Sequence, residues 1–378
     1  MKICFFPVKE IDVGAAGSNG VVRVASSLAR ELRSRGNEVF FYPPPPFSEK
    51  SENLSESAAA RFCRFLREHA IDVAVWHMGS ANRPFPLDNL PCPLVSVWHM
   101  SPDYKASREY ILRICERCKI PRPLHGILGS ALPRFFIGKL YERVRRNAFF
   151  YATRHSARFV LLSEGFFPAF PPAKKFPEKI CAIPNFMTAQ RQDCAAEKEK
   201  ILLFVGRLEN GQKRVDLLLK IWAKLEKAFP QWRLEIVGDG PSRGGLEALA
   251  GTLGLQRVTF EGFQKPEKYY RRAPIFCMTS AFEGFGMVLI EAAAFGCVPV
   301  AFESFAAVRD IISDGENGAL VPPFDLDKYA ETLAALMSDD ALRERLAANT
   351  AQICEKFAPA KIVDRWEALF AEVLAGKK

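Results

Sequence analysis

Long apolar runs are missing from this sequence. No stretch reaches about 18 consecutive apolar residues, the minimum for a helix that spans a membrane. No charged and apolar leader segment precedes the first predicted strand, residues 3–6. The sequence therefore predicts a cytoplasmic protein. Its 378 residues, 49% of them hydrophobic, are enough to bury a large core and to form two domains.

A complete set of zinc ligands is missing as well. Most of the ten cysteines lie in apolar runs, as Cys4, Cys181 and Cys277 do, which is typical of small buried residues in a reducing compartment. Cys115 and Cys118 form one C-x-x-C, but no second pair or nearby histidine completes a zinc site. We read this pair as incidental; for the protein as a whole we expect no metal ion and no cofactor.

Acidic residues are scarce in the first half. Residues 1–185 contain 27 Lys and Arg against 16 Asp and Glu, whereas the remainder contains 25 against 27. This asymmetry indicates an anionic partner for the first half. No nucleic-acid-binding motif accompanies the charge. Arginines and aromatic residues are interleaved over 134–158, which fits an anionic membrane surface or a lipid-linked acceptor; the alternative is a solvated helix face with a buried aromatic side.

Strands and helices alternate along the chain. In the first half, apolar strands are predicted at 3–6, 39–42, 73–76, 94–98, 159–162 and 180–183, with helical spacing at 21–32 and 58–66 and a long helical region, broken by prolines, at 111–157. The second half repeats the alternation from residue 201 to 321, which is the pattern of a parallel sheet with helices on both faces. The polar stretch 190–200 is the predicted linker.

The residues from Thr279 to Pro299, TSAFEGFGMVLIEAAAFGCVP, carry the strongest site signal. A buried strand ends just before them, Glu283 lies in a loop with Gly284 and Gly286, and a helix is predicted from Met287. Free backbone N–H groups at such a helix start can bind phosphate. Glu283 and Glu291 flank these amides, which fits a ligand that is anionic in the middle and hydroxyl-rich at both ends, as nucleotide sugars are.

A basic loop upstream complements this stretch. In FVGRLENGQKRVD, residues 204–216, Gly206 opens the loop after a buried strand, and Arg207 and Lys213 are placed at its carboxyl end. Two fixed cations there can neutralise a diphosphate leaving group; the alternative is a solvated surface loop. Gly238, in a Gly-Asp-Gly turn after another strand, either approaches the diphosphate or serves the turn alone.

Two further patterns have simpler explanations. Asp325 and Asp327 form an acid pair, but they open a predicted helix, so capping accounts for them better than metal binding. The glycine loop at 14–20 has the spacing of a dinucleotide fingerprint, yet no acidic residue follows the next strand to hold a ribose. A nicotinamide cofactor is therefore not expected.

The motifs VGRL, QKRVDLLL, IVGDGP, FEGF and SAFEGFGMVLIEA, in this order, resemble those of the retaining glycosyltransferases of family 4. The match is dense over residues 201–323 and thinner before them. The resemblance implies an α/β protein of the GT-B fold, with two Rossmann-like, doubly wound domains that face a central cleft. It implies an acceptor-binding domain at 1–186, a donor-binding domain at 187–358 and a final helix at 359–378 that packs back on the first domain.

The resemblance also implies roles for individual residues. Glu283 would bind hydroxyls of the donor sugar, with Arg207, Lys213 and His99 as further catalytic-site residues. His99 follows a strand and would bond to the sugar, although a lone histidine is as often structural. The donor-binding set, including the backbone amides near the helix start and a nucleobase pocket at Phe263, comprises Gly17, Gly206, Gly238, Phe263, Phe285, Gly286, Met287 and Glu291.

The function implied is sugar transfer with retention from a nucleotide diphosphate donor, a UDP-sugar, without metal. The acceptor would be a glycan or lipid-linked glycan in lipopolysaccharide, capsule or exopolysaccharide synthesis, and the enzyme would be cytoplasmic or peripheral on the inner face of the membrane. Two alternatives remain: a nucleotide-sugar epimerase on the same fold, and a non-catalytic peripheral-membrane scaffold.

Overall fold

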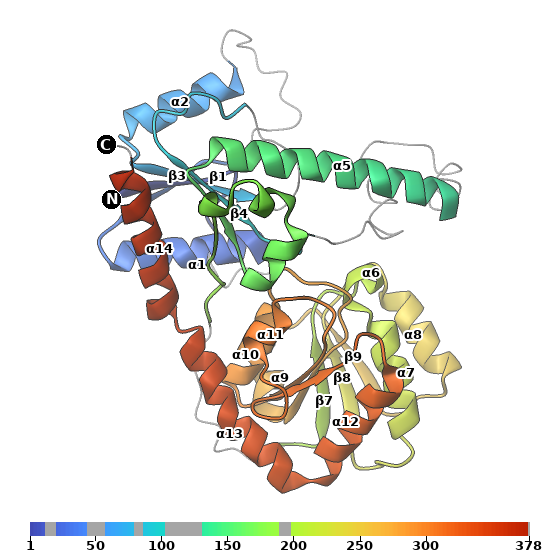
Figure 1. Cartoon of the computed structure of the whole chain (residues 1–378). Helices are drawn as coiled ribbons and strands as arrows, with labels where there is room; N and C mark the ends of the chain where they lie inside the picture. The colour runs from blue at the N-terminus through green and yellow to red at the C-terminus, as the bar shows by residue number, and fades with distance from the viewer. Residues whose placement is uncertain (12–19, 44–56, 79–85, 103–130, 189–197, 377–378) are drawn as a thin grey trace. The chain divides into compact units, whose positions relative to one another are not determined.

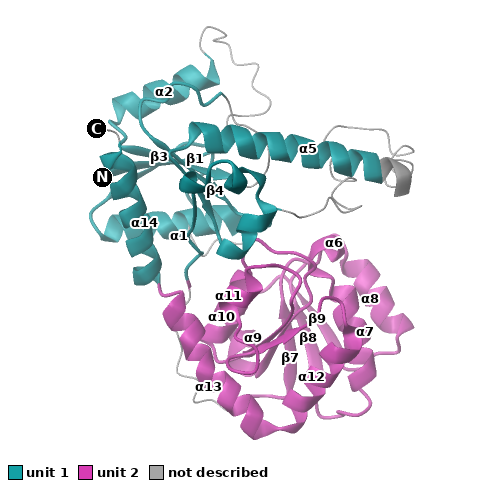
Figure 2. Cartoon of the chain, in the orientation of Figure 1, with its two compact units in different colours: residues 1–105, 135–186, 359–378 teal, residues 106–134, 187–358 magenta. Residues whose placement is uncertain are grey.

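The protein consists of two parallel-sheet α/β units (Figures 1 and 2). The computed structural model describes residues 1–11, 20–43, 57–78, 86–102, 131–188 and 198–376, without the side chains of 131–134. Unit 1 comprises residues 1–105, 135–186 and 359–378, and unit 2 comprises residues 106–134 and 187–358. Most of the predicted linker, at 189–197, lies outside the described residues.

Unit 1 contains a six-stranded parallel sheet in the order β2-β1-β3-β4-β5-β6. Its strands follow the apolar runs of the sequence, because strands of a parallel sheet are covered on both faces and need few polar positions. The elements are β1 (Lys2–Phe6), α1 (Gly20–Ser34), β2 (Glu38–Phe41), α2 (Ala58–Glu68), β3 (Val73–Met78), β4 (Leu94–Trp98), α5 (Ala131–His155), β5 (Arg158–Leu161), the 3₁₀ helices η1 (Glu164–Ala169), η2 (Pro171–Lys174) and η3 (Pro177–Lys179), β6 (Ile180–Ala182) and α14 (Pro359–Ala375).

Helix α14 holds the C-terminal segment against unit 1. It packs along α1, and Glu367 accepts hydrogen bonds from Arg35 Nη1 at 2.9 Å and from Asn37 Nδ2 at 2.8 Å. Arg158 at the start of β5 forms an ion pair with Glu372. The last helix is therefore part of the first unit's structure, although unit 2 precedes it in the sequence.

Unit 2 contains the second six-stranded parallel sheet, in the order β12-β11-β10-β7-β8-β9. The strict alternation predicted for the second half is confirmed. The elements are β7 (Ile201–Val205), α6 (Asn210–Lys213), α7 (Val215–Leu225), β8 (Arg233–Val237), α8 (Arg243–Thr252), β9 (Val258–Gly262), α9 (Glu267–Arg272), β10 (Ile275–Met278), α10 (Met287–Ala294), β11 (Val298–Phe302), α11 (Val308–Ile311), β12 (Ala319–Val321), α12 (Leu326–Ser338) and α13 (Asp340–Lys356).

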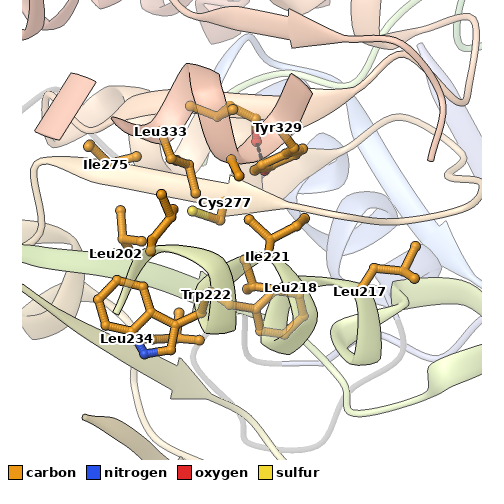
Figure 3. Packing of buried hydrophobic residues seen from close by; sticks show 14 of the residues in the cluster. Leu202, Leu217, Leu218, Ile221, Trp222, Leu234, Ile275, Cys277, Tyr329 and Leu333 are labelled. Carbon is orange, nitrogen blue, oxygen red and sulfur yellow. Dashed lines mark hydrogen bonds between the residues drawn. The ribbon is translucent and has the colours of Figure 1, made fainter. Parts of the chain in front are cut away.

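One face of the second sheet packs against α7, α8 and α12 (Figure 3). Leu202 and Leu234 from the sheet belong to one buried cluster with Trp222 and Leu218 of α7, and Leu333 of α12 is part of the same cluster. All five side chains are fully buried. Full burial of one such apolar side chain contributes about 1.5–3 kcal/mol, so this layer anchors the strands whose carboxyl ends carry the predicted site residues.

One prediction about a helix needs correction, and one helix was missed. The prolines were expected to break the helical region 111–157, but α5 begins at Ala131 and contains Pro133 in its first turn, where the missing N–H has no partner to lose. The residues before it, 103–130, lie outside the described part. The short helix α6 was not predicted at all. Across the described ranges, no helix combines the length and apolar character needed to cross a bilayer.

Tyr329 provides a test of how α12 is fixed to the sheet. Its buried hydroxyl accepts from the N–H of Met278 at 3.1 Å and donates to the carbonyl of Val300 at 2.7 Å, so it joins α12 to both β10 and β11. We expect Tyr329→Phe to destabilise unit 2 by about 1–3 kcal/mol, because two buried backbone groups lose their partner. Thermal unfolding and hydrogen exchange of the β10 and β11 amides measure the effect.

The control is Tyr269→Phe. It removes the same hydroxyl from a hydrogen bond of 2.8 Å to Glu261, whose carboxylate is only partly buried and can turn to water. A loss below about 1 kcal/mol is expected there. Equal losses in the two variants would show that the Tyr329 hydroxyl does not hold α12 in place.

Candidate functional site

The predicted residues of unit 2 gather where the winding of the sheet reverses. From β7 the chain continues through β8 to β9 on one side, and then places β10, β11 and β12 on the other side of β7. The loops that follow β7 and β10 therefore emerge next to each other at the carboxyl edge of the sheet. This is the topological switch point at which open α/β sheets bind ligands. We call residues 206–214 the β7 loop and residues 279–286 the β10 loop.

Backbone and side-chain hydrogen bonds join these two loops. The N–H of Ala281 donates to the carbonyl of Gln212 at 2.7 Å. The hydroxyl of Thr279 lies 3.2 Å from the carbonyl of Lys213 and 3.0 Å from that of Arg214. Arg214 has a left-handed backbone, φ 49°, which ends α6 and starts α7 in a new direction. The carbonyls that α6 leaves unpaired at its end thus bind the β10 loop.

Glu283 is held by two side chains from the β7 loop. Lys213 Nζ forms an ion pair with its Oε1 at 2.6 Å, and Gln212 Nε2 donates to its Oε2 at 3.1 Å. The Glu283 side chain is 9% exposed and that of Lys213 is 16% exposed. Each Glu283 oxygen has a second lone-pair direction and the ammonium has two further protons, so both groups can still bind a ligand. The carboxylate is suited to accept from hydroxyls, and the ammonium to bind an anion.

Glycines bring the loops after β7 and β8 into direct backbone contact. Gly238 has φ +141°, and a Cβ atom on it would lie 1.9 Å from the carbonyl oxygen of Gly206. At Gly206, a Cβ would lie 3.3 Å from the ring of Phe204 and 3.7 Å from Cε of Lys213. The close packing of one backbone on the other therefore requires glycine at position 238, and this packing explains the glycine without a role in ligand binding.

The start of α10 supplies backbone donors. Gly286 is its N-cap with φ +95° and has no side chain to cap the helix; its carbonyl accepts from the N–H of Leu289 at 2.9 Å, so the amides of Met287 and Val288 need other partners. The Phe285 side chain is buried and packs edge-to-face on Phe357 at 5.4 Å, so only its backbone can serve a ligand. Glu291, one turn further, is 9% exposed and receives the hydroxyl of Tyr270 at 3.4 Å.

Arg207 and Phe263 extend into solvent at the same edge. The Arg207 side chain is 60% exposed, with its Nε 3.9 Å from Glu209, and can reorient toward an anion. Phe263 directly follows β9 and is 60% exposed, an unusual exposure for an aromatic ring. The structure thus places the β7 loop, the β10 loop, Gly238 and Phe263 at one sheet edge, while the ligand roles expected of them stay predictions.

Of the residues predicted in unit 1, the structure describes His99. His99 directly follows β4 and is 8% exposed, and its Nε2 lies 2.9 Å from Nδ1 of His77 in β3. Burial lowers the pKa of His99 to about 4. Burial is also the main cause that lowers the pKa of His77 well below its usual value, and the neighbouring His99 is the second cause. Gly17 lies outside the described residues.

No residue cluster in the described ranges has the make-up of a metal site. Asp325 accepts from the N–H of Lys328 at 2.9 Å and so caps α12, as predicted, and Asp327 pairs with Lys224 at 2.6 Å. Metal independence itself stays a prediction.

Sequence reasoning missed three partners in these groups. Gln212 stands next to Lys213 in the motif, but its contact with Glu283 depends on the turn of α6. Tyr270 lies 21 residues before Glu291, and His77 lies 22 residues before His99. The apolar pattern of β3 predicted the strand but not its register against β4. That register pairs Met78 with Trp98 and so sets His77 close to His99.

The Lys213–Glu283 pair predicts an unequal pair of variants. Lys213→Met leaves a buried carboxylate with Gln212 alone, and we expect unit 2 to lose about 3 kcal/mol of stability at neutral pH. Adding Glu283→Gln removes the unpaired charge, so the double variant should recover most of the loss. Thermal unfolding of both single variants and the double variant completes the cycle. Simply additive losses would show that the two groups do not interact.

Known proteins are similar to this chain in the sequence of unit 2 and in the fold. Residues 186–353 match the family model described as glycosyl transferases group 1. The alpha-1,4-N-acetyl-D-galactosaminyltransferase of Campylobacter jejuni that acts on a GalNAc-GalNAc-diNAcBac-PP-undecaprenol is 33% identical over 183 residues, 48% of this chain and 50% of that protein. The lipopolysaccharide 1,6-galactosyltransferase of Salmonella typhimurium is 32% identical over 151 residues, 38% of this chain and 41% of that protein.

The alignments thus span about half of these relatives or less. A solved structure covers more: that of Anabaena Alr3699/HepE in complex with UDP has a TM-score of 0.68 at 19% identity, over 98% of this chain and 100% of that one. Such a likeness concerns the fold. Residues 186–353 therefore form a glycosyltransferase group 1 domain, in a chain whose two units have the fold of the GT-B glycosyltransferases.

Proposed function

We propose that this protein transfers a sugar, with retention of configuration and without a metal ion, from a UDP-sugar to a glycan or lipid-linked acceptor during synthesis of a cell-surface polysaccharide. The observation that carries the proposal is the junction of the β7 and β10 loops at the switch point. It combines one carboxylate, one ammonium and the free amides of a helix start. Those groups match the sugar hydroxyls and the diphosphate of such a donor.

The charged groups and the backbone amides at this sheet edge have different parts in the proposal. Lys213, Arg207 and the amides from Phe285 to Met287 would neutralise charge on the departing diphosphate. Glu283 would orient the sugar, and Glu291 would bind the ribose. In the reaction the bond between the anomeric carbon and the diphosphate oxygen breaks, while the acceptor oxygen bonds to the same face of that carbon. The acceptor proton passes to the leaving diphosphate, so no carboxylate nucleophile is required.

The relatives support the proposed acceptor and donor classes. The Campylobacter and Salmonella proteins are named for a lipid-linked glycan and a lipopolysaccharide, and the Anabaena protein was solved in complex with UDP. The epimerase alternative predicts donor turnover without any acceptor, and the scaffold alternative predicts no nucleotide binding.

The first experiment is a screen of the purified protein against nucleotide diphosphates and nucleotide sugars without metal. We expect stabilisation by UDP and slow hydrolysis of a UDP-sugar, with affinity falling about 10–100-fold in Arg207→Ala and Glu291→Ala, as for loss of a hydrogen bond to a charged group. Arg345→Ala, an exposed arginine on α13, is the matched control and should bind normally. Absence of a response to every nucleotide would refute the donor assignment.

We infer that the protein attaches peripherally to the inner face of the cytoplasmic membrane through α5. Phe135, Phe136, Leu140 and Val144 on this helix are 58%, 63%, 63% and 47% exposed. Exposed basic residues accompany them, namely Lys139, Arg143 and Arg146. An apolar stripe flanked by cations fits the interface of an anionic bilayer. Further along the helix Phe149 is buried, so the expected buried aromatic side exists only toward its C-terminal end.

The attachment predicts a salt-sensitive affinity for anionic vesicles. Phe136→Ser with Leu140→Ser should reduce co-sedimentation with phosphatidylglycerol vesicles by about 10-fold or more, since each large apolar side chain contributes about 1.5–3 kcal/mol when buried. Phe324→Ser, at an exposed phenylalanine of unit 2, is the control and should leave binding unchanged. Equal binding by all three proteins, or binding to neutral vesicles alone, would exclude α5 as the membrane contact.

A further inference from the structure

Two histidines of unit 1 form a closed pair. His77 is the fifth residue of β3, and His99 is the first residue after β4. The backbone N–H of His99 donates to the backbone carbonyl of Met78 at 3.2 Å. Their rings are nearly parallel, 16° apart, with centroids at 5.2 Å and His77 Nδ1 2.9 Å from His99 Nε2. At that distance the two nitrogens form a hydrogen bond, in which one carries the proton and the other accepts it.

The environment of His77 is apolar and sealed. The residue is 3% exposed, its ring lies against Phe5 at 4.6 Å, and its Nε2 is buried without a hydrogen-bond partner. His99 retains more exposure, 8%, and no described residue bonds to its Nδ1. His99 Nδ1 is thus the nitrogen of this pair that is left for a ligand. Burial lowers the pKa of both rings, so the pair is neutral near pH 7.

Two arrangements of the protons satisfy the bond between the rings. In the first, His99 Nε2–H donates to His77 Nδ1, which places the only proton of neutral His77 on the sealed Nε2. In the second, His77 Nδ1–H donates to His99 Nε2, which leaves a lone pair on the sealed nitrogen and the proton of His99 on Nδ1. Buried N–H groups without a partner are rarer than incompletely satisfied acceptors, so the second arrangement costs less.

We propose that His77 is a positioning residue that holds His99 in its Nδ1–H tautomer, so that His99 donates a hydrogen bond to an oxygen of a ligand at the carboxyl edge of the unit 1 sheet. That this ligand is a sugar rests on the function proposed above, whereas the tautomer does not. A neutral imidazole free of partners exchanges between two tautomers and offers a donor or an acceptor. The His77 contact removes that choice, and selects substrates whose oxygen accepts at this position.

The tautomer can be measured directly, because the chain has only five histidines. Long-range ¹⁵N–¹H correlation spectra of the ¹⁵N-histidine-labelled protein distinguish a protonated from an unprotonated ring nitrogen. We expect His99 and His77 both in the Nδ1–H form at neutral pH. His77→Asp, whose carboxylate can only accept, should place a proton on His99 Nε2, and His77→Asn, whose amide can still donate to His99 Nε2, should retain Nδ1–H. Either finding His99 as Nε2–H in the wild type, or finding its Nε2 still unprotonated in His77→Asp, would overturn the proposal.

Kinetics test the consequence for the substrate. His77→Asp should lower kcat/KM for the UDP-sugar with the highest turnover by about 10-fold while the affinity for UDP, which lacks the sugar, stays unchanged; His77→Asn should keep most of the wild-type value. A variant misfolded in unit 1 can still bind UDP through unit 2, so thermal unfolding is compared with the wild type, and where it shows misfolding the wild-type and His77→Asn spectra decide. If the wild type binds no nucleotide sugar, the proposed function fails, and the spectra still confirm or refute the His77 tautomer effect.

Discussion

The ion pair between Lys213 and Glu283 is the contact on which the arrangement of unit 2 depends at its carboxyl edge. Two loops that are 70 residues apart in the sequence meet there, at the one place where adjacent strands send their connections to opposite sides of the sheet. A ligand-binding edge needs opposite charges that lie close together and still have hydrogen-bonding capacity left for the ligand. The Gln212 hydrogen bond and the backbone contacts between the loops fix the carboxylate in place, and each of its oxygens keeps a second lone-pair direction.

Much of unit 2 was predictable because its signals are local. A parallel strand covered on both faces reads as an apolar run, and a glycine-bearing loop before a helix reads as an anion site, so β7, β10 and α10 were found at nearly their true bounds. The sequence also pointed to Glu283 and Lys213 as members of one site. The sequence pattern did not show that the two groups contact each other. Their contact depends on the turn of α6, which ends at Arg214 in a left-handed conformation that is uncommon for arginine.

Unit 1 illustrates what local patterns leave out. The interleaved arginines and aromatic residues of α5 allow either an exposed or a buried aromatic side, and the structure contains both, at opposite ends of the same helix. Burial is decided by what the rest of the fold places against each turn, which no window of sequence contains. The His77–His99 contact has the same origin: it depends on the register of β3 against β4, and a shift by one residue would point the two rings to opposite faces.

The position of α14 has a consequence for biosynthesis. Unit 1 is assembled from segments on both sides of unit 2 in the chain, and its last segment contributes the partners of Arg35, Asn37 and Arg158. A ribosome delivers residues in order, and domains fold as their sequences emerge. Unit 2 is complete when residue 358 leaves the ribosome. Most of unit 1 is synthesised earlier, but it lacks α14 until the residues after 358 have been added. The N-terminal unit is therefore the later of the two to reach its finished form.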